Sequence, residues 1–196
     1  MKFARMRDPR TGKIVRGEVG KGDLIETESG TFSVSEVELL APVNPTKIVC
    51  VGLNYKDHIE ETGSDVPERP SLFFKPPSAV TDPGEPILIS EGTRHDPEGE
   101  VAVVIGKTCK NVTREEALNY VLGFTGLNDV TNRDAQSWEQ NWVRAKAFDT
   151  AAPMGPYVVT PDEIDLPISF ELEVNGSVRQ SSDTSNLIFS IPHLIE

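Results

Sequence analysis

The sequence has few cysteines and no long apolar run, and each shortage excludes a class of protein. No stretch of the 196 residues is long and apolar enough to cross a bilayer, and the opening MKFARMRDPR lacks the apolar centre of a signal peptide. The only cysteines are Cys50 and Cys109, and no Cys/His spacing typical of zinc sites occurs. We therefore expect a soluble cytoplasmic protein with reduced thiols.

Basic residues are also scarce. Nineteen Lys and Arg stand against 31 Asp and Glu, which gives a formal net charge of -12 at pH 7. Because nucleic acids and anionic membranes bind clustered Lys and Arg, neither is expected as a partner. A glycine-rich phosphate loop is missing too, and the expected strands do not alternate regularly with helices. A doubly wound nucleotide-binding sheet is therefore not predicted.

Short alternating apolar segments separated by Gly and Pro predict a β-rich α+β fold with few short helices. Residues 1–45 are expected to form a small N-terminal β lobe, joined at the proline-containing segment 39–47 to a domain spanning residues 46–196. Strands are predicted over 47–55, 71–76, 100–106, 123–130, 156–160, 168–176 and 177–184. Helices are predicted over 56–63, over 113–121 from a Thr113–Glu116 capping box, as a turn over 134–141, and from about Ser190.

Two glutamates, Glu98 and Glu100, stand one residue apart at the head of the apolar run 101–105. In a strand they share one face. Two carboxylates in a partly dry place stay ionised only if a cation lies between them; otherwise one takes up a proton. The pair is therefore a candidate metal site, although spacing alone favours an exposed strand start equally.

A third acid, Asp129, follows the apolar extended segment 123–128. If it lies beside the strand of the two glutamates, three carboxylates converge, and an all-oxygen site of that charge suits Mg²⁺, Mn²⁺ or Ca²⁺ better than zinc or copper. Taken alone, Asp129 fits a turn cap somewhat better. Arg133 and Asp134, which follow it, form by default a surface ion pair of little energetic weight.

Two further positions carry possible acid–base chemistry. His58 and Glu61 lie three residues apart on the predicted helix, and a carboxylate beside an imidazole raises its basicity, as a general base requires. The local sequence alone favours an ordinary exposed helix. Lys146, among Ala145, Ala147 and Phe148, is either half-buried and paired with an acid or extends past its apolar neighbours.

Six collinear segments resemble the fumarylacetoacetate hydrolase family: KIVCVGLNYKDHIEE, LFFKPPSAV, DPEGEVAVVIGK, GLNDVTNRDAQ, AKAFDTAAPMGPYVVT and LEVNGSVRQSSDTSNLIF. The resemblance runs from about Lys47 to the last residue. It implies a mixed β-roll fold, a homodimer, and a divalent metal that is Mg²⁺ or Mn²⁺, with Ca²⁺ possible in a crystal. Family members continue for roughly 40 residues more, so we expect this chain to lack a C-terminal segment and to leave sheet edges unpaired.

The resemblance also implies roles for single residues. The family's metal-binding acids correspond to Glu98, Glu100 and Asp129. Its catalytic residues, an acid–base pair on a mobile lid and a lysine, correspond to His58, Glu61 and Lys146. Its positions near the substrate carboxylate and the metal-bound water correspond to Arg133 and Gln136.

The implied activity is metal-dependent chemistry on a 2-oxo acid through a metal-bound enolate. Hydrolytic C–C cleavage of an acylpyruvate is the first expectation, because it needs the His58–Glu61 pair to activate water. Oxaloacetate decarboxylation or tautomerisation, and isomerisation of a 2-hydroxyhepta-2,4-diene-1,7-dioate type of diacid, are alternatives. So are a non-catalytic protein that binds a metal and a keto acid, and an acidic cluster that only holds a structural Ca²⁺.

Overall fold

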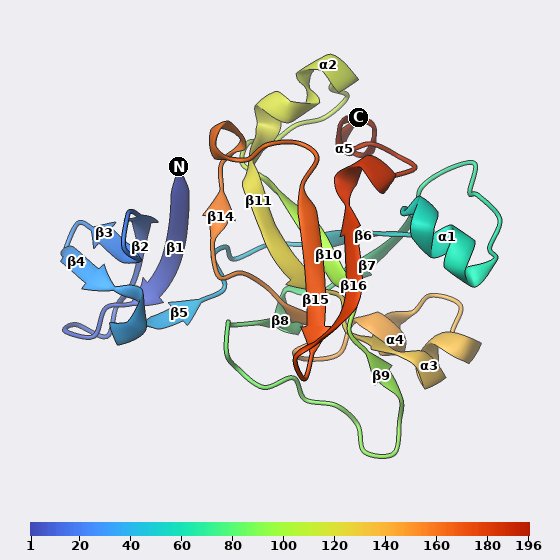
Figure 1. Ribbon diagram of the computed structural model, residues 1–196, viewed down its shortest axis with the longest axis horizontal. Helices are drawn as coiled ribbons and strands as arrows, with labels where there is room; N and C mark the ends of the chain where they lie inside the picture. Colours follow the sequence, from blue (N-terminus) through green and yellow to red (C-terminus); the bar gives the residue numbers. More distant parts are fainter.

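Strands supply most of the regular structure in the computed structural model, which describes residues 1–196 (Figure 1). The strands are β1 Lys2–Arg7, β2 Ile14–Val19, β3 Leu24–Thr27, β4 Gly30–Ser33, β5 Glu38–Leu40, β6 Ile48–Gly52, β7 Ser71–Lys75, β8 Val80–Thr81, β9 His95–Asp96, β10 Gly99–Ile105, β11 Val121–Asn128, β12 Thr131–Asn132, β13 Ala152–Pro153, β14 Val158–Val159, β15 Ser169–Val174 and β16 Ser177–Asp183. The predicted β-rich α+β class is confirmed.

The helices are few and short. The α-helices are α1 Lys56–Thr62, α2 Arg114–Ala117, α3 Arg133–Trp138, α4 Val143–Lys146 and α5 Ile191–Ile195. The 3-10 turns are η1 Val34–Glu36, η2 Pro77–Ala79, η3 Leu118–Tyr120, η4 Pro161–Glu163 and η5 Thr184–Asn186. None of the helices has the length and apolar character that crossing a lipid bilayer would require.

The largest sheet joins the N-terminal strands to the strands that carry the two glutamates' segment. Its strand order is β10-β11-β14-β1-β2-β3-β4, with β5 also paired to β1. The connection runs through β14, which pairs with β1 at Lys2↔Val159 and with β11 at Phe124↔Val159. A Cβ on Gly123 would lie 2.4 Å from the carbonyl oxygen of Val159, so only glycine permits this close approach of backbones.

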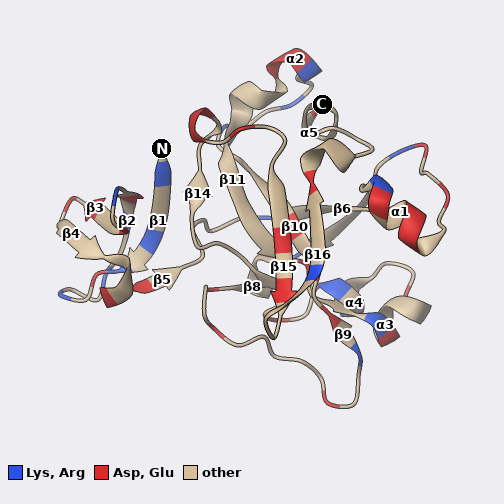
Figure 2. Cartoon of the chain, in the orientation of Figure 1, with Lys and Arg blue, Asp and Glu red and all other residues tan.

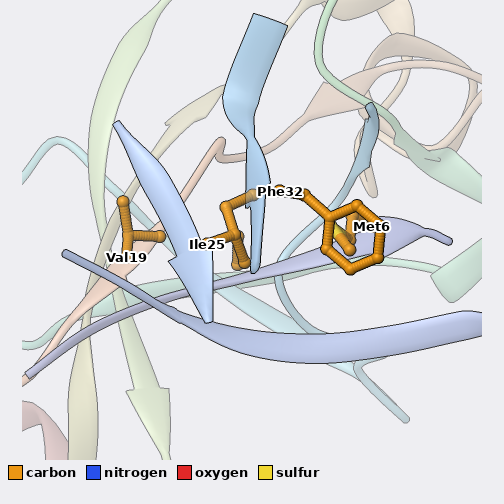
Figure 3. Packing of buried hydrophobic residues seen from close by; sticks show 5 residues of the cluster. Met6, Val19, Ile25 and Phe32 are labelled. Atoms are coloured by element: carbon orange, nitrogen blue, oxygen red, sulfur yellow. The ribbon is translucent and has the colours of Figure 1, made fainter. Parts of the chain in front are cut away.

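The N-terminal strands β1–β5 lie together on one side of the molecule and enclose a small core of their own (Figure 1). Met6, Val19, Ile25 and Phe32 point toward one another between the strands (Figure 3). Ile25 and Phe32 are directly opposed on β3 and β4. Burying each such side chain contributes roughly 1.5–3 kcal/mol to the stability of this unit.

Smaller ribbons complete the remainder of the fold. β6 pairs with β7, β15 with β16, and β9 with β12, all antiparallel, while β8 and β13 are parallel. The β15–β16 hairpin turns at Asn175 and Gly176, whose φ values of 53° and 74° are those expected for an Asn-Gly turn. A second core cluster lies behind the ends of β10 and β11: Ala79, Leu127, Ala151, Ala152 and Met154.

Two local predictions were wrong. The strand predicted over 47–55 ends at Gly52, because Leu53 takes a φ of 55° and leaves the strand. Thr113 does not form a capping box: its carbonyl accepts the Glu116 N–H at 3.1 Å, and its hydroxyl donates instead to the Glu116 carboxylate at 3.5 Å. The helix it precedes ends at Ala117 and continues only as a 3-10 turn.

Candidate active site

Glu98 and Asp129 are brought together by the pairing of β10 with β11. Gly99 is opposite Asn128 in this antiparallel pair, so Glu98 and Asp129 face each other just beyond the strand ends. The Asp129 N–H donates to the Glu98 carbonyl at 2.7 Å, and the Glu98 N–H donates to Oδ1 of Asn128 at 3.0 Å. The relative position of the two acids is therefore set by main-chain contacts.

Lys146, the last residue of α4, lies between these two carboxylates. Its Nζ donates to Oε2 of Glu98 at 2.6 Å and to Oδ2 of Asp129 at 2.8 Å, and its side chain is only 4% exposed. Of the two interpretations left open by the sequence, the structure has the buried lysine paired with acids. The ammonium is thus a fixed positive charge in a place from which water is largely excluded.

A second buried lysine, Lys75 at the end of β7, lies on the other side of Asp129. Its Nζ is 2.7 Å from Asp129 Oδ1, close enough for an ion pair although the geometry does not meet that of a hydrogen bond. It donates to the carbonyls of Lys146, Ala151 and Val130 at 2.5, 2.9 and 3.4 Å. Burial lowers the pKa of Lys75, against the opposing effect of Asp129.

Sequence reasoning did not single out Lys75. A signal was present, since a lysine that ends the apolar strand SLFFK is unusual unless its charge has a partner. The partner itself comes from a segment more than fifty positions away, which no local pattern reveals.

Arg133, at the start of α3, is the third cation of the site. Its guanidinium donates from Nε to Asp96 and from Nη1 to Gln136, both at 2.8 Å, and its Nη2 forms an ion pair with Oε1 of Glu98 at 2.7 Å. The expected Arg133–Asp134 surface pair is wrong, because Asp134 instead accepts the backbone N–H of Arg94 at 2.7 Å. Basic and acidic segments accordingly lie close together at β9, α3 and α4 (Figure 2).

The charges around Glu98 and Glu100 differ sharply. Burial would raise the pKa of Glu98, but Lys146 and Arg133 outweigh it and hold that pKa below its usual range. Glu100 has no such partner: burial, together with the negative charges of Glu98 and Asp129, raises its pKa to about 8. At neutral pH in the absence of added cations, Glu100 therefore carries a proton.

Several hollows lie on the surface, two of them of several hundred cubic ångströms. One of about 650 Å³ is lined by Glu100, by the loop containing Ile87 and Ile89, and by β15 from Phe170 onward. Lys146, Asp129 and Arg133 do not line it. The other, of about 530 Å³, lies between Tyr157 and the 82–85 loop and is remote from these acids. The first hollow has the volume of a small-molecule site and adjoins the acid cluster through Glu100.

His58 and Glu61 are both on α1 and both exposed, and they form no hydrogen bond or ion pair with each other or with the acids. α1 lies at the side of the molecule opposite the N-terminal strands (Figure 1). Its first turn is anchored, since Asp57 accepts hydrogen bonds from Ser182 and Asn186 at 2.5 and 3.3 Å. The structure therefore leaves His58 and Glu61 apart from the other predicted site residues. Those that it brings together are Glu98, Glu100, Asp129, Lys146, Arg133 and Gln136.

The donor set near the strand ends fits a hard divalent cation in its chemistry. It consists of three carboxylates, and one of them, Glu100, is crowded by two like charges with no cation of its own. In this arrangement no three His, Cys, Asp or Glu side chains stand at the mutual spacing of an assembled metal site, because Glu98 and Asp129 are turned to Lys146. Ion binding would require these carboxylates to be shared between Lys146 and the metal.

A model of the fumarylacetoacetate (FAA) hydrolase C-terminal domain matches residues 47–196. The chain belongs to this family. The fumarylacetoacetate hydrolase fold is also that of a 5-carboxymethyl-2-hydroxymuconate delta-isomerase from Mycobacterium smegmatis, which is 37% identical with a TM-score of 0.88 over 100% of this chain and 80% of the other.

Family relatives differ in their named activities. An oxaloacetate tautomerase, YisK of Bacillus subtilis, is 44% identical over 87% of this chain and 60% of its own length. A maleylpyruvate hydrolase from Sphingobium sp. SYK-6, solved with manganese(II) and pyruvate, is 26% identical with a TM-score of 0.79, over 100% of this chain and 81% of the other. Members of the family thus bind a divalent metal. The chain spans 60–74% of the length of three of its relatives.

Proposed function

We propose that the protein is a divalent-metal-dependent enzyme that acts on a small 2-oxo acid through its enolate. The observation that carries the proposal is the placement of the Lys146 ammonium 2.6 and 2.8 Å from Glu98 and Asp129, beside a Glu100 that lacks a cation of its own. Fixed charges of this kind, aimed at a place where charge develops, are the usual means of stabilising an enolate.

Glu98, Glu100 and Asp129 would hold the ion, which we propose to be Mg²⁺ or Mn²⁺. When bound, such an ion supplies Lewis-acid stabilisation of the negative charge that develops on a 2-oxo group. The named manganese-containing relative supports the choice of a hard divalent cation.

The residues of the chain then bind and orient the substrate. Arg133 and Gln136, joined at 2.8 Å, present donors to a carboxylate, which a guanidinium recognises with directional charge-assisted hydrogen bonds. Lys146 holds its proton near the oxygen on which negative charge develops. Burial of Lys146 at 4% exposure strengthens that interaction, because little water screens it.

Hydrolysis of an acylpyruvate is the first candidate reaction. His58, assisted by Glu61, takes a proton from water; the water oxygen bonds to the distal carbonyl carbon, and the bond from that carbon to C3 breaks. The electron pair passes to the pyruvate enolate, which is then protonated at C3, and the other product is a free acid. Because His58 and Glu61 are exposed on α1, this reaction requires α1 to close over the acids as a lid.

Keto–enol tautomerisation of oxaloacetate is the second candidate, with decarboxylation of the same acid or isomerisation of a larger unsaturated diacid close to it. The exposure of His58 and Glu61 favours this candidate, because none of these reactions needs an attacking water. The tautomerase and isomerase relatives support it as well. A tautomerisation moves one proton from C3 to the oxygen at C2, so it needs a proton acceptor and a proton donor but no water as nucleophile.

We further propose that the protein works as a homodimer, without a nucleic acid or membrane partner. The net charge of -12 supports the second part of this proposal.

The test is to incubate the purified protein with Mg²⁺ or Mn²⁺ and either acetylpyruvate or oxaloacetate, following the enol absorbance and identifying products, with EDTA as the control. EDTA-sensitive release of pyruvate and acetate supports hydrolysis. Turnover of oxaloacetate alone supports the second candidate, and its product separates tautomerisation from decarboxylation. Inactivity on both substrates, with metal and pyruvate still bound, leaves the isomerase of a larger unsaturated diacid and the non-catalytic binding protein.

A further inference from the structure

The sequence RHDPEGE places an acid, Asp96, two residues before Glu98, and no role has yet been given to it. It lies on β9, which pairs with β12 at Thr131↔Asp96 and Asn132↔His95. Beyond this ribbon the Arg133 N–H donates to the Arg94 carbonyl at 2.9 Å, and the Arg94 N–H donates to Asp134. The strand pairing, one further backbone hydrogen bond and the Asp134 side chain therefore hold the segment of Asp96 against the start of α3.

The carboxylate of Asp96 is itself clamped. Arg94 donates to both of its oxygens, from Nε at 3.0 Å and from Nη2 at 2.8 Å. Arg133 donates to one of these oxygens as well, at 2.8 Å, so three hydrogen bonds from two guanidinium groups hold the carboxylate in place.

Arg133 takes its direction from this charge. One oxygen of Asp96 accepts Nε at 2.8 Å, which leaves the two terminal nitrogens of the guanidinium facing Glu98 and Gln136. Because the guanidinium is planar and rigid, fixing Nε fixes the plane and the direction of both terminal nitrogens. The order of contacts is Arg94, Asp96, Arg133, Glu98, from an exposed side chain to the acid cluster.

We propose that Asp96 is a positioning residue that aims Arg133 at the substrate carboxylate and keeps the guanidinium from binding Glu98 with both of its terminal nitrogens. The claim about binding rests on the proposed function, whereas the claim about Arg133 geometry does not. Asp96 lines the hollow beside Glu100 but forms no ion pair with Lys146, and in this proposal it acts through Arg133.

The experiment compares Asp96→Asn, which keeps the shape and removes the charge, with Asp165→Asn, a control at an exposed aspartate that forms no ion pair. The first measurement is solvent exchange of the Arg133 Nε–H by NMR of the metal-free protein. We expect it to be slow in the wild type and in Asp165→Asn, and about tenfold faster in Asp96→Asn, since the charged acceptor is lost. Unchanged exchange in Asp96→Asn overturns the proposal.

The second measurement is the binding of pyruvate and the KM for the 2-oxo acid in the presence of Mn²⁺. Asp96→Asn should weaken both about tenfold with kcat within about threefold, and Arg94→Gln should have a smaller effect in the same direction. In an Arg133→Met background, Asp96→Asn should add less than about twofold. Full additivity of the two substitutions overturns an action through Arg133.

The two hypotheses fail in different ways. If the wild type neither binds pyruvate nor turns over a 2-oxo acid, the proposed function is wrong, while the exchange measurement still decides whether Asp96 orients Arg133. If the wild type is active and Asp96→Asn retains both its KM and its slow exchange, only the positioning role is wrong.

Discussion

The carbonyl of Glu98 accepts the N–H of Asp129 at 2.7 Å, so two acids 31 positions apart are joined by a main-chain hydrogen bond. Their side chains then meet the same ammonium, that of Lys146. The main chain therefore determines where the negative charges lie, and the lysine determines how much of that charge is balanced. The carboxylate of Glu100 has no cation of its own to balance its charge.

The first prediction concerns stability against pH. The pKa of Glu100 rises from 4.5 to about 8 on folding, so between these values the folded protein holds a proton that the unfolded chain has released. The contribution of this proton to the free energy of unfolding is complete below the ordinary pKa of a glutamate. It is lost as the pH rises toward about 8. Without metal, wild type should lose on the order of a few kcal/mol more than Glu100→Gln between about pH 5 and 8. Urea unfolding in EDTA measures this, with the exposed Glu60→Gln as control; equal slopes in wild type and Glu100→Gln contradict it.

The second prediction is that metal binding releases a proton. Because Glu100 is protonated at neutral pH, its use as a ligand must displace that proton, and the apparent affinity for Mn²⁺ should rise with pH up to about 8. Calorimetry at pH 7 in two buffers of different ionisation enthalpy should report about one proton released per ion. The Glu100→Gln variant should release none. An affinity independent of pH would show that Glu100 is not a ligand.

The third prediction tests another ligand. Glu98→Gln should weaken Mn²⁺ binding by roughly 100-fold, because a neutral amide replaces a charged oxygen donor. Titration calorimetry gives the affinity directly, and circular dichroism shows whether the fold is kept. Glu26→Gln, at an exposed position on β3 outside the hollow, is the control and should bind like the wild type. Wild-type affinity in Glu98→Gln would remove Glu98 from the metal site.

The fourth prediction separates the two candidate reactions. If hydrolysis is the activity, His58→Ala should lower kcat for acetylpyruvate by about 100-fold or more, the contribution typical of a general base. The rate of oxaloacetate tautomerisation by this variant should stay within about threefold of the wild-type rate, because that reaction uses no attacking water. Glu60→Ala on the same helix controls for effects on α1 itself. Unimpaired cleavage of acetylpyruvate by His58→Ala would exclude the histidine as the base.

The fifth prediction concerns Lys75. Its replacement by Met leaves the buried Asp129 with one cation fewer and removes the donor from three carbonyls. We expect the free energy of unfolding to fall by about 3–5 kcal/mol, the cost of breaking a buried ion pair. Chemical denaturation compares this variant with Lys13→Met, an exposed lysine on the first hairpin. A loss below about 1 kcal/mol would mean that Asp129 is satisfied by Lys146 alone.

The sequence was a good guide wherever the deciding interactions were local. The alternation of side chains in a strand predicted that Glu98 and Glu100 share a face, and the negative charge of Glu98 adds to the effect of burial in raising the pKa of Glu100. The Asn175–Gly176 turn followed from two residues that adopt positive φ at little cost. The β-rich fold was likewise predicted from a local pattern, the short alternating apolar segments separated by Gly and Pro.

The contacts between residues far apart in the chain could not be predicted from the sequence. Nothing near Arg133 indicates that its partner is Asp96 rather than the adjacent Asp134, because the pairing of β9 with β12 decides it. Lys75 was overlooked for the same reason. The family resemblance, which compares the whole chain, supplied the grouping of the acids with Lys146 that local patterns left open, while the assigned roles await the experiments above.

The three carbonyls that accept hydrogen bonds from Lys75 belong to three different segments: the turn after β11, the end of α4 and the stretch before β13. No one of them can open without giving up a bond to the same ammonium. Amide exchange in these segments should therefore report one cooperative unit rather than three independent loops. A substitution that loosens any one segment would then also disturb the hydrogen bond between Lys75 and the Lys146 carbonyl. Substitutions in these three segments should therefore not act independently.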